Sequence, residues 1–537
     1  MSRIFIQPDV RGRKFRSRFA RLAFACLLLA PLLVSLQHAS ARQRRRTPAR
    51  AAKATQPQRT VESSLVREAA AHLQAGRLEE AEAAARNALA ANARDAEAHA
   101  LLGVILDQRG RPEEAERELR EALRLDSRST AALTNLGVLL VRTSRADEAA
   151  KHFEEALSLA PAHEQAAYNL ALLYVARKDY ARSLPLLERF MKSKGGAESA
   201  DMSLLITLAA AYAGAGRIAD ASKLSDAVEQ RAGEDPRVLF TLGLALADAG
   251  GYERAARLFE RTNQLRPGTF EVLYNLGVAL FNVGRLDEAR KALQDAATLK
   301  PEDPEVFFRL GVVASAKGES ENALGLWQRA VKLRPEYAEG YFMIAEELVK
   351  NRRNERAFPF YERAVALDPS QAIYHARLGV AHFRARRYAQ AREKFEAALK
   401  RFPDNATLHF LNGYAARAEG QFDFALDAFR RSLELEPDNA DAYANIGFLT
   451  AERGQHEEAE RLLRRALALD AENYPATYDL GRLLVRLKRY DEALPLLERG
   501  ARIGQNDPGV HYQLFLVYSR LKRKSEADRE LATFKRL

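Results

Sequence analysis

Residues that could carry catalysis or bind a metal are few in this sequence, and their spacing suits neither task. The chain has 10 histidines and one cysteine, Cys26, which excludes a disulfide framework or a thiolate metal site within one chain. His375 and His382 lie seven residues apart, and no H-E-x-x-H zinc motif accompanies them. We interpret both as surface imidazoles rather than as a metal pair.

Phosphate and acyl chemistry leave sequence signatures that are also missing. The chain contains no Walker loop, no dinucleotide-binding glycine pattern, no nucleophile elbow and no CxxC pair. Asp and Glu together number 72, and most of them recur at fixed positions of the repeat described below, which is typical of a solvated helix face. The sequence therefore predicts no enzyme, no catalytic residue, no metal site, no cofactor and no small-molecule substrate.

The formal net charge of +11 comes from one end of the chain. Residues 1–61 hold 14 Lys or Arg and a single acid, Asp9, which gives 14 − 1 = +13. Residues 62–537 hold 83 − 14 = 69 basic and 72 − 1 = 71 acidic residues, which gives −2. Because no basic stripe runs along the larger part, the high charge does not indicate a nucleic-acid partner.

The N-terminus has the three parts of a secretory signal. Seven basic residues precede residue 22, an apolar run fills 22–36, and Ala39 and Ala41 form an A-x-A site. We therefore expect a signal peptide over 1–41 with cleavage after Ala41, and an exported, periplasmic or secreted protein. Two alternatives stay open. Four arginines follow the site and favour an uncleaved inner-membrane anchor with the repeats outside the cytoplasm, and an Arg-rich start also suits an organelle transit peptide.

Residues 42–61 lack apolar periodicity and are predicted to be a disordered basic linker. The linker is either a solvated tether or a segment attracted to anionic lipid or polymer. Membrane contact is expected only through residues 1–61.

From residue 62 onward the chain repeats every 34 residues. Units begin at 62, 96, 130, 164, 202, 236, 270, 304, 338, 372, 406, 440, 474 and 508. One step is longer by four residues, and the extra segment 194–201 is interpreted as a longer turn or as a hinge. Repeats of this length predict stacked supersecondary units that share one continuous core.

Each unit is predicted to form two amphipathic helices. Places 4, 7, 8 and 11, counted from the first residue of a unit, are apolar or small, which is the spacing of a helix face. Glycine is frequent at place 15, between the helices, and proline at place 32, after the second helix. Nine units carry glycine at place 8, inside the first helix, where it costs up to about 1 kcal/mol relative to alanine. We infer that two helices approach closely there.

The period, the Leu-Gly pair at places 7 and 8, alanine at place 20 and the terminal proline resemble the tetratricopeptide repeat family. The resemblance covers 62–537 and implies an all-α, right-handed superhelical solenoid of about fourteen helix-turn-helix repeats. Three residues depart from the pattern: Glu68 and Asn412 at the leucine place, and Phe515 at the glycine place.

In this family the face formed by places 2, 5, 9 and 12 lines a concave groove, and proteins or peptides are its usual partners. Aromatic residues at place 5 are candidates for a binding groove or for packing against the next unit: Tyr168, Phe240, Tyr274, Phe308, Phe342, Phe410, Tyr478 and Tyr512. Asparagines at place 6 resemble a broken ladder for a peptide backbone: Asn135, Asn169, Asn275 and Asn445. Place 5 is never basic, which argues against recognition of chaperone C-terminal carboxylates.

The sequence thus favours a non-catalytic scaffold of the bacterial cell envelope that binds protein partners. The alternative is an accessory subunit that presents substrates to a separate envelope enzyme, such as a glycosyltransferase or a polysaccharide-export complex.

Overall fold

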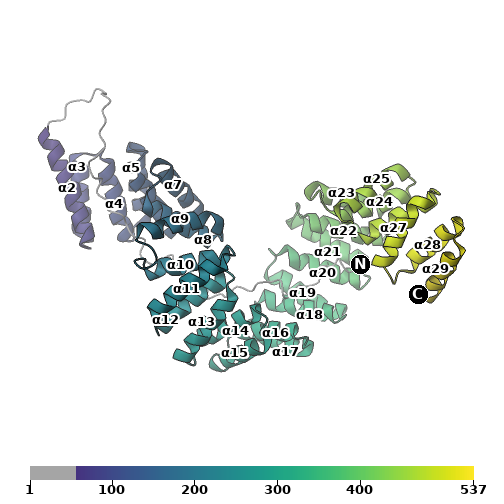
Figure 1. Ribbon diagram of the computed structural model, residues 1–537. Helices are drawn as coiled ribbons and strands as arrows, with labels where there is room; N and C mark the ends of the chain where they lie inside the picture. Colours follow the sequence, from purple (N-terminus) through teal and green to yellow (C-terminus); the bar gives the residue numbers. More distant parts are fainter. Residues whose placement is uncertain (1–55) are drawn as a thin grey trace. The chain divides into compact units, whose positions relative to one another are not determined.

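A computed structural model describes residues 56–537, with side chains from residue 64 onward (Figure 1). This part of the chain contains 28 α-helices and no strand. The helices form fourteen consecutive pairs, which confirms the predicted all-α solenoid and its repeat number. The chain divides into two compact units at Pro301, and residues 56–301 and 302–537 are described separately.

The helices of each pair are short and similar in length. Residues 56–301 contain α2 (Gln56–Gln74), α3 (Leu78–Ala91), α4 (Ala96–Gln108), α5 (Pro112–Leu125), α6 (Thr130–Arg142), α7 (Ala146–Leu159), α8 (Glu164–Ala176), α9 (Tyr180–Ser193), α10 (Met202–Gly214), α11 (Ile218–Ala232), α12 (Pro236–Asp248), α13 (Tyr252–Leu265), α14 (Phe270–Asn282) and α15 (Leu286–Leu299). Residues 302–537 contain α16 (Pro304–Ala316), α17 (Ser320–Leu333), α18 (Ala338–Lys350), α19 (Asn354–Leu367), α20 (Ala372–Arg384), α21 (Tyr388–Arg401), α22 (Ala406–Ala418), α23 (Phe422–Leu435), α24 (Ala440–Glu452), α25 (His456–Leu469), α26 (Tyr474–Arg486), α27 (Tyr490–Ile503), α28 (Pro508–Arg520) and α29 (Lys524–Arg536).

Every even-numbered helix from α4 to α28 begins at the first residue of a predicted unit. The exception is α2, which begins at Gln56, so the predicted end of the linker at residue 61 is wrong. Proline is tolerated in the first turn of a helix, and Pro57 is the second residue of α2. Once the amphipathic segment that follows has nucleated a helix, each added residue contributes one more hydrogen bond.

The predicted signal peptide and residues 42–55 lie outside the described residues. None of the helices in residues 56–537 combines the length and the hydropathy that a membrane span requires.

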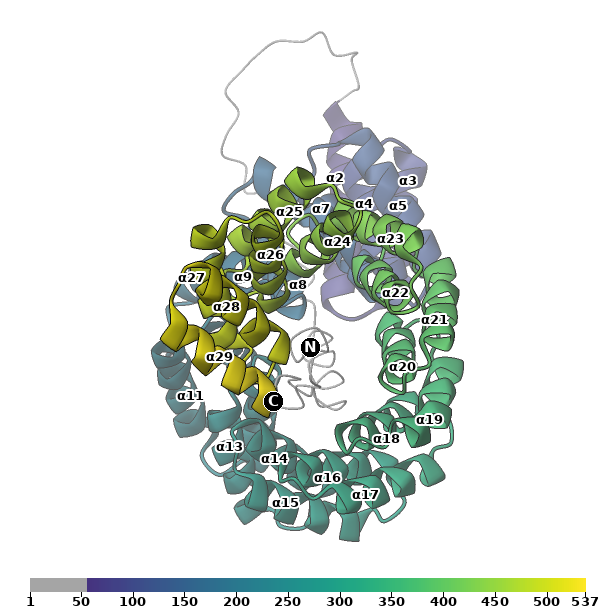
Figure 2. The same cartoon turned by 90° about the vertical axis from the view of Figure 1, so that its right-hand side faces the viewer.

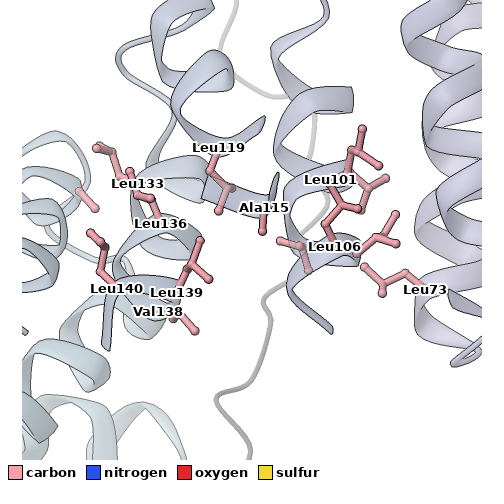
Figure 3. Packing of buried hydrophobic residues seen from close by; sticks show 14 of the residues in the cluster. Leu73, Leu101, Leu106, Ala115, Leu119, Leu133, Leu136, Val138, Leu139 and Leu140 are labelled. Atoms are coloured by element: carbon pink, nitrogen blue, oxygen red, sulfur yellow. The ribbon is translucent and has the colours of Figure 1, made fainter. Parts of the chain in front are cut away.

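Leucines of successive helices form the core that the apolar face predicts. In residues 56–301, Leu106 of α4, Leu119 of α5 and Leu136 of α6 are at most 2% exposed and belong to one hydrophobic cluster (Figure 3). Each such side chain contributes roughly 1.5–3 kcal/mol through burial. Because the cluster joins neighbouring pairs, no single pair can bury its apolar face alone.

The glycines at place 8 allow the close approach that the sequence predicts. A Cβ atom added to Gly311 would lie 2.5 Å from Nε1 of Trp327, and one added to Gly277 would lie 2.5 Å from Cγ of Leu293. Trp327 is fully buried and its Nε1 donates a hydrogen bond to the Phe308 carbonyl oxygen at 3.1 Å. The indole therefore has little freedom to retreat.

Gly311→Ala is expected to destabilise residues 302–537 by about 1–3 kcal/mol, because the added methyl overpacks the Trp327 contact. Gly325 is the matched control, since it lies in the second helix of the same pair and an added Cβ would meet nothing within 4 Å. Gly325→Ala should stabilise by up to about 1 kcal/mol through helix propensity. Urea unfolding of the two variants measures the difference, and equal midpoints would contradict the close-approach explanation.

The turn between paired helices needs one residue in the left-handed region. Place 15 has positive φ throughout, at eight glycines such as Gly284 (φ 87°) and at six other residues such as Lys488 (φ 63°). The amide N–H groups of these residues close the end of the preceding helix, as Lys488 does on the Val485 carbonyl at 3.0 Å. A residue with a Cβ costs roughly 1–2 kcal/mol in this conformation.

Lys488→Gly is therefore expected to raise the free energy of unfolding by about 1 kcal/mol, because glycine adopts φ 63° without steric cost. Lys488→Ala keeps the Cβ and should change stability little. Thermal unfolding of both variants tests the explanation, and an equal gain in both would show that the lysine charge, not the backbone, is responsible.

The segment 194–201 fits the longer-turn interpretation. Gly195 and Gly196 have φ values of 88° and 87°, and α9 packs against α10 across the turn. Arg231 of α11 donates a hydrogen bond through Nη1 to the Ala200 carbonyl oxygen at 2.7 Å. The boundary between the compact units lies elsewhere, at Pro301.

Candidate functional site

Within residues 302–537 the even-numbered helices lie on the inner side of the curve and the odd-numbered helices on the outer side. Figure 2 shows this for α18, α20 and α22 against α19, α21 and α23. The two sides differ in the partners that their arginines contact.

Several outer-side arginines form ion pairs between successive repeats. Arg489 lies 2.6 Å from Glu460 of the preceding pair and 2.7 Å from Glu492 of α27, the helix that it caps. In residues 56–301, Arg145 bridges Glu116 and Glu148 in the same way. These carboxylates neutralise the arginines, so the stacking of repeats accounts for these charges on the outer side.

Four of the predicted groove aromatics belong to the core. Tyr274, Phe308, Phe342 and Phe410 are at most 6% exposed. The Phe342 ring lies 4.6 Å from that of Tyr374 in the next unit, which covers it. The packing interpretation of place 5 therefore holds for these four, and a surface role for them is wrong.

The other four place-5 aromatics are partly exposed. Tyr168 stacks on Phe190 at 4.5 Å, and Phe240 lies 5.6 Å from Phe259. Tyr478 is half-buried, and Tyr512 is 40% exposed. Their use by a partner stays a prediction.

The asparagines at place 6 are largely committed to their own helices. Asn275 and Asn445 each donate through Nδ2 to the carbonyl oxygen four residues earlier, at 2.7 Å. Asn169 accepts from Gln165 at 3.3 Å, and its buried Nδ2 has no partner among the described residues. Asn135 is half-buried. An amide that already bonds its own helix is poorly placed to hold a peptide backbone, and a role for these residues stays a prediction.

One of the two histidines is not at the surface. His382 is 6% exposed and stacks on Phe358 with ring centroids 4.2 Å apart, so the interpretation of this imidazole as a surface group is wrong. Burial lowers the pKa of His382, which favours the neutral form of the ring. His375 is half-buried, and its Nε2 lies 3.2 Å from the Pro369 carbonyl oxygen. Among residues 56–537, no group of three or more His, Cys, Asp or Glu side chains could hold a metal ion.

A set of stacked arginines and aromatic rings on the inner side was not predicted. We call it the arginine–aromatic ladder and define it as Phe383, Tyr414, Arg417, Phe448 and Arg482. The Phe383 and Tyr414 rings are 5.2 Å apart, and the Arg417 guanidinium lies 5.5 Å from the Tyr414 ring and 4.7 Å from the Phe448 ring. The Arg482 guanidinium lies 5.2 Å from the Phe448 ring. The ladder thus runs through α20, α22, α24 and α26.

The ladder residues occupy places 9 and 12, where the units of residues 56–301 carry mainly aliphatic side chains. This difference is visible in the sequence, where arginine or an aromatic residue occupies at least one of these two places in four successive units. The signal is spread over two places and four units, so neither place alone reveals it.

Charge is unevenly compensated along the ladder. Arg417 makes no ion pair with any residue of the described chain, and its Nη1 donates to Asn445 Oδ1 at 2.5 Å. Arg482 pairs with Glu452 at 3.0 Å and lies 3.5 Å from Asp479. Burial raises the pKa of Asp479 to about 6, and the positive charges of Arg482 and Arg417 oppose that rise.

The repeat geometry agrees with comparison of the sequence with known families. Two models, each described as tetratricopeptide repeat, match this chain. The matched residues are 66–132, 134–198, 240–304, 308–372 and 376–447 for one model and 450–514 for the other. The chain belongs to the tetratricopeptide repeat family. Comparison with proteins of curated function finds no match.

Several solved structures are similar to this one. The APC/C hetero-tetramer Cut9-Hcn1 shares 14% identity over 85% of this chain and 96% of its own, with a TM-score of 0.37. YrrB, a tetratricopeptide repeat protein with an unusual peptide-binding site, shares 22% identity over 35% of this chain and 96% of its own, with a TM-score of 0.31. PilF of Pseudomonas aeruginosa shares 26% identity over 40% of this chain and 97% of its own, with a TM-score of 0.34.

Proposed function

We propose that this tetratricopeptide repeat protein is a non-catalytic scaffold of the bacterial cell envelope, and that it binds protein partners through the inner, even-numbered helices. The observation that supports this most is the arginine–aromatic ladder, of which every member except the buried Tyr414 is half-buried. Arginine and aromatic side chains are enriched among the residues that dominate protein interfaces. Stacking of repeats already uses the outer arginines, and it leaves Arg417 without a carboxylate partner.

The envelope location is part of the proposal and rests on the N-terminal sequence. The basic residues before 22, the apolar run over 22–36 and the A-x-A site ending at Ala41 support export.

The mature protein is expected to begin at Arg42 when it is isolated from the producing cell. N-terminal sequencing of the purified chain measures this directly. A membrane-bound product that retains the apolar run would favour the anchor, and a cytosolic product starting at Met1 would contradict export.

Affinity capture from envelope extracts tests the scaffold function. The bait is the full mature chain, and the control is the same chain with Arg417→Gln and Arg482→Gln. We expect structural components of an envelope assembly to be retained by the wild type and lost with the variant. Retention of one enzyme instead would support the accessory-subunit alternative. Capture of the same proteins by both chains would place the binding surface elsewhere.

A further inference from the structure

The geometry points to an extended acidic segment of a partner protein as the ligand of the arginine–aromatic ladder. This inference rests on the proposed function and specifies its ligand. Three observations carry it: the spacing of the ladder, the charge of the inner side, and the contrast with residues 56–301.

The ladder has the form of a track along successive repeats. Its members come from α20, α22, α24 and α26, and each is within 5.5 Å of the next. A guanidinium that stacks on a ring presents its N–H groups at its edge, where a carboxylate can accept two of them. An extended chain alternates its side chains between two sides, so every second residue would face such a track.

Charge complementarity selects acidic side chains. Places 2, 5, 6, 9, 12 and 13 of these four helices carry five arginines: Arg377, Arg384, Arg417, Arg482 and Arg486. They carry three carboxylates: Asp441, Glu452 and Asp479. The net charge is therefore 5 − 3 = +2.

Arg417 is the member best suited to an incoming carboxylate. Its guanidinium is half-buried between the Tyr414 and Phe448 rings and has no ion pair within the described chain. A partly desolvated cation attracts an anion more strongly than one in bulk water does.

The inner side of residues 56–301 lacks this character. The corresponding helices carry Asn135, Thr207 and Thr241 at place 6, and Val138 and Leu244 at place 9. The acidic ligand is therefore assigned to residues 302–537 alone.

Single-stranded nucleic acid is the other polyanion that binds aromatic and cationic tracks. One feature disfavours it. The Phe448 ring already has two guanidinium groups within 5.2 Å, which compete with a stacking base.

Fluorescence anisotropy of the full mature chain tests the inference with labelled synthetic probes. The probe is a short peptide in which glutamate alternates with tyrosine, compared with peptides carrying lysine or glutamine in place of glutamate, and with oligothymidylate. We expect the dissociation constant of the glutamate peptide to be at least about tenfold lower than those of the other probes.

Two double variants that remove the same charge test whether the ladder is the binding site. Arg417→Gln with Arg482→Gln should weaken binding of the glutamate peptide by about tenfold or more, since each removes a charge-assisted contact. The control is Arg430→Gln with Arg461→Gln, which removes two exposed arginines of the outer helices α23 and α25. This control should leave the affinity within about twofold of wild type.

A variant with increased affinity separates a direct effect on the ligand from a loss of binding that misfolding would cause. Asp479→Asn removes the carboxylate that competes for Arg482 and should tighten glutamate-peptide binding at neutral pH. Equal losses in the two arginine pairs, no effect of Asp479→Asn, or tighter binding of oligothymidylate would overturn the inference. If envelope proteins are captured through the ladder while all glutamate peptides fail to bind, the acidic ligand is wrong and the proposed function stands.

Discussion

Phe342→Ala is expected to lower the free energy of unfolding of residues 302–537 by about 3–5 kcal/mol, the usual cost of removing a buried phenylalanine. Phe342 is 1% exposed, and its ring contacts Tyr361 at 5.8 Å and Tyr374 at 4.6 Å. Truncation would remove the side chain that joins the pair α18 and α19 to α20. Chemical denaturation followed by circular dichroism measures the loss.

Phe422 provides the matched control, because it is also a phenylalanine of this compact unit but is 46% exposed. Phe422→Ala should change the unfolding free energy by less than about 0.5 kcal/mol, as expected for a surface position. Hydrogen exchange should show the damage of Phe342→Ala near α18–α20, since repeats contact only their neighbours. Full stability of the Phe342 variant together with lost partner binding would restore place 5 as a binding surface.

Asp479→Asn should stabilise the protein above about pH 6 and have little effect in strong acid. Burial raises the folded-state pKa of Asp479 to about 6 from 3.8, and its side chain is 12% exposed. Between these values the folded state binds more protons than the unfolded state, so stability falls as pH rises through about 6. The difference between these two pKa values corresponds to roughly 3 kcal/mol of stability lost at neutral pH.

The measurement is the unfolding free energy of wild type and variant at several pH values. The groups around Asp479 are Arg417, Arg482, Glu452, Tyr474 and Tyr478, and the arginines stay charged over the whole range. A stability difference that is present above about pH 6 and vanishes below about pH 4 is expected. A difference that does not vary with pH would show that Asp479 does not titrate in this range.

Much of the fold could be predicted because the repeat imposes the same local constraint many times. A single glycine inside a helix says little, whereas glycine at place 8 in nine units required a common cause. The Gly311–Trp327 contact supplies that cause. The beginnings of helices followed from the same register, with α2 as the exception, because the first helix has no preceding unit to set its start.

The binding surface was harder to predict, because exposure depends on the next unit. A helical wheel places Phe308 and Phe342 away from the main apolar stripe, and it cannot show that Tyr337 and Tyr374 cover them. The arginine–aromatic ladder was hard to predict for a different reason. Arg417 and Arg482 lie in different units and on no common sequence motif, and only stacking of the helices brings both against Phe448.

Site-specific photo-crosslinking in the producing cell tests most directly whether the inner helices bind the partners. A photoreactive amino acid is placed at Arg384, an exposed inner position of α20, and in a second strain at Arg430, an exposed outer position of α23. Binding along the inner side predicts discrete crosslinked products from position 384 and none from position 430. Products from position 430 alone would contradict it and assign partner binding to the outer helices.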